Sequence, residues 1–245
     1  FNTLFNSFKV SIAAPVLSIA IGTPLAYIFS IYQIKGKSLL NILIIVASMS
    51  APFIGAYSWI LLLGRSGVIT TFFRNIGINI PDIYGFGGIV LVMTLQLFPL
   101  VFLYAKGALK NIDNSLVEAA NNLGCSGLKC FFKVVIPLIM PTLLAAALLV
   151  FMRSFADFGT PMLIGEGYRT FPVVLYTEFI NEVGGNDGFA AAIAVIAIVV
   201  TTVVFLAQKY VSNKNAFSLN ALHPIEEKTP KGLTGFLATA ASDPI

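Results

Sequence analysis

The chain alternates between long stretches without any charged side chain and short polar segments. Five stretches lack Asp, Glu, Lys, Arg and His, and each is long enough to cross about 30 Å of hydrocarbon at about 1.5 Å per residue. Runs of this length favour helices over strands, and a helix satisfies its own backbone in lipid. The pattern therefore predicts five transmembrane helices, over residues 10–31, 38–63, 83–105, 134–152 and 188–208.

The composition agrees with a membrane protein. Of the 245 residues 57% are hydrophobic and 11% are charged, whereas a soluble domain carries about a quarter charged residues. The mean hydropathy is +0.89. We therefore expect an all-α integral membrane protein embedded in a lipid bilayer. Prolines within the runs, Pro52 among them, can kink the helices because each removes a backbone hydrogen bond.

The positions of lysine and arginine predict the orientation. With five spans the polar flanks fall into two sets, and the richer set in Lys and Arg belongs in the cytoplasm. The poorer set also contains the acidic loop 153–187. This places the N-terminus outside and the C-terminus in the cytoplasm, and it explains the net charge of +4 without a nucleic-acid partner. The richer set holds Lys35, Lys37, Lys106, Lys110, Lys129, Lys133, Lys209, Lys214, Lys228 and Lys231, and the poorer set holds Lys9, Arg65, Arg74, Arg153 and Arg169.

The domain organisation follows from these spans. Residues 1–211 are expected to form one transmembrane domain, with a cytoplasmic loop at 113–133. Residues 212–245 begin as a polar linker and become apolar again. Because the chain has no initiator methionine, we expect it to be a fragment of a longer membrane protein.

The chain lacks the residues that several kinds of catalytic or metal site require. Cys125 and Cys130 lie on the predicted cytoplasmic loop, where thiols stay reduced, and their spacing matches no zinc or haem motif. His223 is the only histidine, so neither a histidine triad nor a metal centre is expected. No P-loop is present. If ATP drives this protein, another chain must bind the nucleotide, and this chain is expected to carry no cofactor.

The loop 113–133 has the pattern of an amphipathic helix. Ser115 and Glu118 have the spacing of a capping box, and Leu116, Ala120 and Leu123 form an apolar stripe. Gly124 follows at the position where a helix ends in a left-handed residue. A second helical piece, 128–133, is expected to continue into the next span. Water would not favour the stripe, so the membrane surface, the protein's own helix ends or a partner must cover it.

At these residues the chain resembles the permease subunits of binding-protein-dependent ABC importers, which share a MetI-like fold. Their cytoplasmic loop has the pattern E-A-A-x3-G-x9-I-x-L-P. Here Glu118, Ala119, Ala120, Gly124 and Pro137 match it, while valine and isoleucine replace the isoleucine and leucine of the pattern at positions 134 and 136. Both replacements are conservative in volume.

The resemblance implies a role for each of these residues. The short helix of the loop would dock into a groove on a cytoplasmic ATPase subunit and transmit its closure to the membrane helices. Glu118 would lie at the polar edge of the docked helix, Ala119 and Ala120 would allow close approach, and Gly124 would set the turn. Pro137 would begin the next span. The alternative for Glu118 is that it only caps the helix and has no further role.

The outer loop carries a second resemblance. "SFADFGTPMLIG" and "FPVVLYTEF" are similar to the first half of the fused two-permease subunits of ferric-iron importers. Importers of phosphonates, polyamines and thiamine share much of this pattern and stay as alternatives. The resemblance implies an extracytoplasmic solute-binding protein, a second permease half after the linker, and a bacterial inner membrane. Residues 171–183 are expected to form an interfacial helix with Glu178 and Glu182 facing water.

Four polar residues are candidates for the translocation path: Asp157, Ser154, Gln96 and Thr94. Asp157 follows the fourth predicted span, at its outer mouth, although a local salt bridge with Arg153 would explain it equally well. For Gln96 and Thr94 the alternative is interhelical hydrogen bonding.

A secondary transporter or channel and a membrane-embedded enzyme are the alternative classes. A secondary transporter or channel is expected to carry ionisable residues within its spans, and these spans have none. A membrane-embedded enzyme needs a convergent nucleophile, base or metal site, and no pair of spans offers one.

Overall fold

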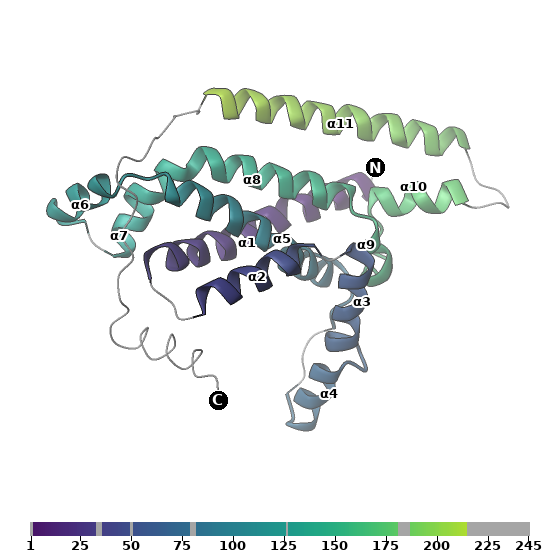
Figure 1. The fold of residues 1–245 in the computed structure, drawn as a ribbon. Coiled ribbons are helices and arrows are strands. Elements are labelled where there is room, and N and C mark those ends of the chain that lie inside the picture. Colours follow the sequence, from purple (N-terminus) through teal and green to yellow (C-terminus); the bar gives the residue numbers. More distant parts are fainter. Residues whose placement is uncertain are drawn as a thin grey trace.

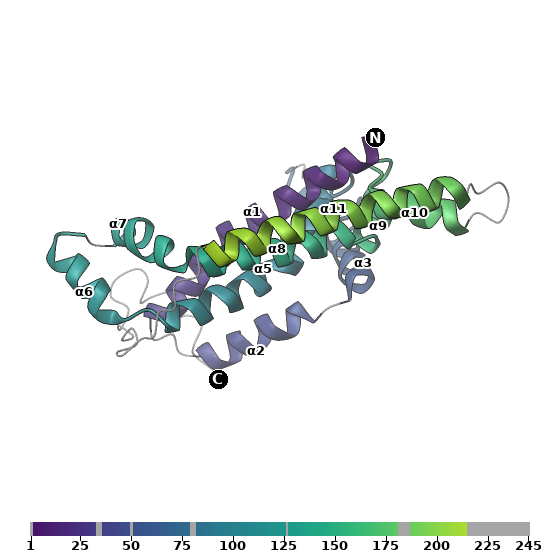
Figure 2. The same cartoon turned by 90° about the horizontal axis from the view of Figure 1, so that it is seen from above.

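Three long helices form the centre of the molecule. The computed structural model describes residues 2–32, 36–49, 51–78, 82–125, 127–180 and 187–214, and all the elements they form are helices. Helices α1 (Asn2–Ile31), α5 (Phe86–Lys110) and α8 (Ile136–Ala156) run side by side. Helix α11 (Asp187–Lys214) lies along one flank of this bundle, and α2 (Lys37–Ser48) lies along the other (Figures 1 and 2).

Small residues allow α1 to pack closely on α5. Ser11, Ala14, Ser18, Gly22 and Ala26 are all buried on α1. A Cβ atom on Gly22 would lie 3.0 Å from the carbonyl oxygen of Phe98 and 3.1 Å from the amide nitrogen of Phe102. Helices in lipid gain stability from such close backbone approach, because burial of apolar surface alone drives little association there.

Replacing Gly22 with leucine is therefore expected to push α1 away from α5. The neighbouring atoms are backbone and cannot rotate aside, so the cost should be about 1–3 kcal/mol or more. The yield of folded protein in detergent and its thermal unfolding would show this loss. Gly87→Leu is the matched control, because a Cβ there meets nothing within 4 Å. Equal behaviour of the two variants would contradict this packing.

Four helical segments of the described residues are long and apolar enough to cross a membrane: Asn2–Ile31, Phe53–Asn75, Phe86–Lys110 and Leu128–Ala156. Three of them contain the first, third and fourth predicted spans or most of their length. The fifth predicted span lies within α11, whose described apolar part, Ala194–Ala207, is shorter. The count of five spans thus stays a prediction.

The prediction of one uninterrupted helix over 38–63 is wrong. Helix α2 ends at Ser48, and α3 (Pro52–Leu63) begins after a break. Ala51 has an extended backbone, with φ −68° and ψ 140°. The ring of a proline disfavours helical backbone in the residue before it, and Pro52 itself has no N–H. Helix α3 and the following α4 (Val68–Asn75) project away from the bundle (Figure 1).

The segments that the positions of lysine and arginine place outside the cytoplasm lie together at one end of the bundle. The side-chain amide of Asn6 donates to the carbonyl of Arg169 at 3.2 Å, and the Phe171 amide donates to the Ser7 hydroxyl at 2.7 Å. Arg65, after α3, forms ion pairs with Glu166 at 2.8 Å and with Asp82 at 3.2 Å. In both pairs the Arg65 guanidinium donates the hydrogen bond to the carboxylate.

Two short helices complete this end. Helix α9 (Gly159–Ile164) follows α8, and α10 (Phe171–Ile180) agrees with the start of the expected interfacial helix. Phe171 is buried, and Glu178 is partly exposed. Glu182 and the end of that expected helix lie outside the described residues, as do residues 215–245 of the expected linker and His223.

Candidate functional site

The loop at the other end of the bundle contains the expected amphipathic helix, α6 (Asn114–Asn122). It begins two residues earlier than a Ser115 cap would require. The carboxylate of Asp113 accepts the Ser115 amide at 3.0 Å, so Asp113 is the capping residue. The predicted capping box of Ser115 and Glu118 is therefore wrong. An aspartate before the first turn caps at least as well as serine, and its charge also suits the helix dipole.

Gly124 ends α6 as expected. Its φ is +81°, a left-handed conformation that residues with a Cβ adopt only at a cost. The Cys125 amide donates to the Ala120 carbonyl at 3.0 Å, which is the six-residue hydrogen bond of a Schellman motif. The end of α6 and the turn that follows it therefore have a defined, hydrogen-bonded backbone conformation.

A continuous helical rod connects this turn to the bundle. Helix α7 (Leu128–Cys130) passes through one π-helical segment (Phe131–Val135) into α8, with Pro137 as the second residue of α8. Phe131 and Val135 are buried. The centroid of the Phe131 ring lies 4.5 Å from the centroid of the Tyr27 ring on α1. A force applied to α7 would therefore reach both α8 and α1.

Three leucines of this loop are exposed, and the rest of the described chain does not cover them. We call Leu116, Leu123 and Leu128 the docking face. Leu123 is 88% exposed and Leu128 is 76% exposed. Glu118 and Ala119 on α6 are also exposed. Apolar side chains gathered around a defined helix are typical of a binding surface.

Two of the four candidate path residues lie inside the packed bundle. Ser154 is buried and donates from its hydroxyl to the Met93 sulfur at 3.1 Å. Thr94 is 3% exposed. Neither the Thr94 hydroxyl nor the Gln96 amide nitrogen has a hydrogen-bond partner among the described residues. The interhelical hydrogen bonds considered for these two atoms are thus not formed within the described chain.

Asp157, just beyond the end of α8, caps α9. Its carboxylate accepts the Gly159 amide at 2.9 Å and the Thr160 hydroxyl at 2.7 Å. Burial raises the pKa of Asp157, while the bonds from Thr160 and Gly159 oppose that rise. No ion pair joins Arg153 and Asp157, both of which are described. The salt bridge proposed between these two residues is therefore wrong.

Two variants of Asp157 separate its charge from its capping. Asp157→Asn keeps one acceptor oxygen, so α9 should remain capped, whereas Asp157→Ala should cost about 1 kcal/mol of stability. Thermal unfolding measures the capping, and solute uptake measures the role of the charge. Uptake that falls in the asparagine variant at unchanged stability would indicate a role at the path mouth. Normal uptake in that variant would leave the cap as the sole function.

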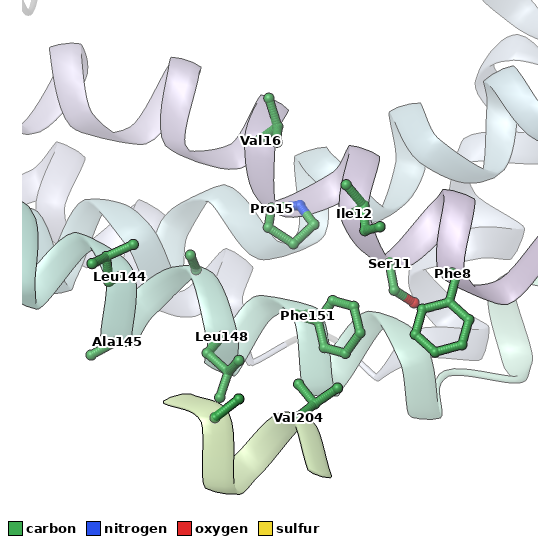
Figure 3. Close-up of a pocket in the computed structure, with 12 residues that line it drawn as sticks. Phe8, Ser11, Ile12, Pro15, Val16, Leu144, Ala145, Leu148, Phe151 and Val204 are labelled. Atoms are coloured by element: carbon green, nitrogen blue, oxygen red, sulfur yellow. The ribbon is translucent and has the colours of Figure 1, made fainter. Parts of the chain in front are cut away.

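An apolar groove of about 490 Å³ lies between α1, α8 and α11 (Figure 3). None of its lining side chains is ionisable, and Ser11 supplies the one hydroxyl. The described residues also contain no group of His, Cys, Asp and Glu that could hold a metal ion. The groove suits hydrocarbon and offers no site for a polar solute.

The bundle of apolar helices and the exposed amphipathic helix at one end agree with the permease class of transport components. The chain belongs to the family described as "Binding-protein-dependent transport system inner membrane component", which matches residues 2–216. This confirms the resemblance found at Glu118 to Pro137. It also confirms that the chain is an inner-membrane component of such a transport system.

Curated relatives with different names match the chain. A putative ferric transport system permease protein FbpB 1 of Haemophilus influenzae is 30% identical over 212 residues, which are 84% of this chain and 32% of the relative. The spermidine/putrescine permease protein PotB of the same organism is 28% identical, over 86% of this chain and 74% of the relative. Its molybdenum permease protein ModB is also 28% identical, over 85% and 91%. The chain thus spans about a third of the ferric relative's length.

Solved structures share the fold. The methionine transporter MetNI in an inward-facing form has a TM-score of 0.65 at 16% identity, over 88% of this chain and 95% of that chain. A bacterial alginate ABC transporter in complex with an alginate-pentasaccharide-bound periplasmic protein has a TM-score of 0.72 at 15% identity, over 87% and 78%. The predicted MetI-like fold is therefore confirmed.

Proposed function

We propose that this chain is the membrane permease domain of an ABC importer, which moves a solute delivered by an extracytoplasmic binding protein. ATP hydrolysis on a separate cytoplasmic subunit would drive the movement. The family membership supports this role. The observation that carries it is the docking face, an exposed apolar surface on a helix with defined ends that continues through α7 into the bundle.

In this proposal Glu118, Ala119 and Ala120 face or border the ATPase groove. Gly124 fixes the angle between α6 and α7, and Pro137 lies where α8 begins. Closure of the ATPase would move α7, and the contact between Phe131 and Tyr27 would pass that movement to α1. The Lys- and Arg-rich end of the bundle would lie in the cytoplasm, with the N-terminus outside and the C-terminus inside.

We propose ferric iron as the transported solute. The similarity to ferric transport permease proteins at 30% identity supports it. The relatives named for polyamine and molybdenum transport are 28% identical, so those solutes, with phosphonate and thiamine, are the alternatives. The binding protein would select the solute, so the permease would need only a polar path. Asp157, Ser154, Gln96 and Thr94 remain its candidate residues, although the burial of Ser154 and Thr94 favours a packing role for these two.

The length of the ferric relatives also supports a second permease half in the native protein. This chain covers 32% and 30% of two of them. Residues 212–245 would then be the linker between the halves, and residues 1–211 the first permease domain. A chain of this kind would need no second permease subunit.

The experiment that tests the solute uses the binding protein encoded beside the permease. Its affinity for ferric ion, molybdate, spermidine, 2-aminoethylphosphonate and thiamine can be measured by calorimetry. Tight binding of ferric ion alone is the expected result. Tight binding of another solute would replace iron, and the absence of any adjacent binding protein and ATPase genes would contradict the importer.

A further inference from the structure

The apolar groove between α1, α8 and α11 begins at the end of the bundle that is predicted to lie outside the cytoplasm. Its lining on α1 starts at Phe8 and ends at Val16, and Phe8 faces Phe151 of α8, with 6.3 Å between the ring centroids. The distance from Phe8 to Val16 along the helix is about 12 Å, at about 1.5 Å per residue. The hydrocarbon of one leaflet is about 15 Å thick, half of about 30 Å, so the groove has nearly the depth of the outer leaflet.

Helix α11 closes one side of the groove without packing tightly on the bundle. It contributes Val204 and Ala207 to the lining, and among the α11 residues whose exposure the structure describes, none is buried. The other lining side chains come from α1 and α8 and are apolar apart from Ser11 (Figure 3). A space of about 490 Å³ with such walls favours hydrocarbon over water, because water would find few hydrogen-bond partners there.

Ser11 is the polar exception in this lining. It is buried, and its hydroxyl oxygen has no hydrogen-bond partner among the described residues. Figure 3 shows it next to Phe8, at the outer end of the groove. Pro15 lies one turn further along α1 and has no N–H, so the Ser11 carbonyl lacks its usual helical hydrogen bond. Polar groups without a partner are costly in apolar surroundings, so a ligand with polar atoms at this end would suit the groove.

Lys9 places a positive charge at the same end of the groove. Lys9, Ile12 and Val16 share one face of α1, at i, i+3 and i+7, and all three are exposed. The Lys9 ammonium lies 4.6 Å from the centroid of the Phe5 ring, one turn nearer the outer end. No carboxylate of the described residues pairs with it. A protein helix laid over this face would bury the charge without a partner, whereas a phospholipid carries a phosphate at the membrane boundary.

We propose that the groove is a binding site for a phospholipid of the outer leaflet. One acyl chain lies along Ile12, Val16 and Leu148, between α11 and the rest of the bundle. The glycerol ester lies at Ser11, whose hydroxyl can donate to the ester carbonyl, and the phosphate pairs with the ammonium of Lys9. Basic residues beside transmembrane helices can bind lipid head groups in this way. The bound lipid holds α11 against α1 and α8, a role that goes beyond the proposed function in transport.

Native mass spectrometry of the full-length protein, assembled with its ATPase subunit, tests this site. The complex is reconstituted with phosphatidylethanolamine and phosphatidylglycerol, transferred to detergent, and analysed for the phospholipid that stays bound. Lys9→Gln removes the charge from an exposed position and should not impair folding, and Ala145→Phe fills the groove from α8. The matched controls are Lys110→Gln, an exposed lysine at the far end of α5, and Ala192→Phe, an exposed alanine of α11 outside the lining.

The parent complex is expected to retain a phospholipid that the Ala145→Phe variant loses. Lys9→Gln should bind this lipid about tenfold more weakly, because a hydrogen bond between charged groups is lost, and both controls should match the parent. Equal retention by Ala145→Phe and Ala192→Phe, or by Lys9→Gln and Lys110→Gln, would overturn the proposal. If a protein helix of the full-length complex covers the groove instead, the parent will retain no phospholipid there, and that result would overturn it as well.

Discussion

Gly124→Val is expected to abolish ATP-driven uptake while the protein still inserts and folds in the membrane. The left-handed conformation at φ +81° costs a residue with a Cβ about 1–2 kcal/mol, and valine is stiffer than most because it is β-branched. The turn would rearrange, and the hydrogen bond from Cys125 to Ala120 would be lost. Uptake and ATP hydrolysis, measured in the same proteoliposomes, should become uncoupled.

Gly107→Val is the matched control for this substitution. Gly107 is exposed on α5, without a left-handed backbone, and a Cβ there meets nothing within 4 Å. Its variant should keep nearly normal uptake. Undiminished uptake in Gly124→Val would contradict a role for the turn in coupling.

Leu123→Asp is expected to release the ATPase subunit from the complex. The side chain is 88% exposed, so the substitution removes little packing within this chain. In a complex, however, a charge would enter an apolar contact. Loss of a central apolar contact at an interface typically costs more than 1 kcal/mol, and we therefore expect affinity for the ATPase to fall by about tenfold or more. Co-purification and surface plasmon resonance would measure it.

Ile78→Asp provides the comparison at the opposite end of the molecule. Ile78 is 50% exposed and lies after α4. Its variant should bind the ATPase normally. Equal loss of binding in both variants would mean that the effect is a general one of added charge, and the docking face would lose its assignment.

Much of the fold could be predicted from the long stretches of sequence that lack charged residues. That absence located α1, α5, α8 and α11 because lipid excludes charged groups along a whole span. The same signal could not show the break before Pro52, since an interrupted helix and a continuous one can be equally apolar. The local backbone preference of the residue before a proline was the available sign.

Some features of the candidate site could likewise be predicted from the sequence, and others could not. Gly124 could be predicted because the left-handed position at a helix end has a strong residue preference. The choice between Asp113 and Ser115 as the cap could not, because both residues cap well and only the backbone path decides between them. The contacts of Ser154 with Met93 and of Phe131 with Tyr27 depend on how helices far apart in the sequence are packed.

The most direct test of the coupling loop is a site-specific photocrosslink. A benzoylphenylalanine residue placed at Leu123 of the full-length protein lies on the docking face, and one placed at Ile78 lies in the exposed segment after α4. Irradiation of the assembled transporter is expected to attach the ATPase subunit to position 123 and not to position 78. No adduct at position 123, or equal adducts at both positions, would contradict the proposal that this loop transmits ATP hydrolysis to the membrane helices.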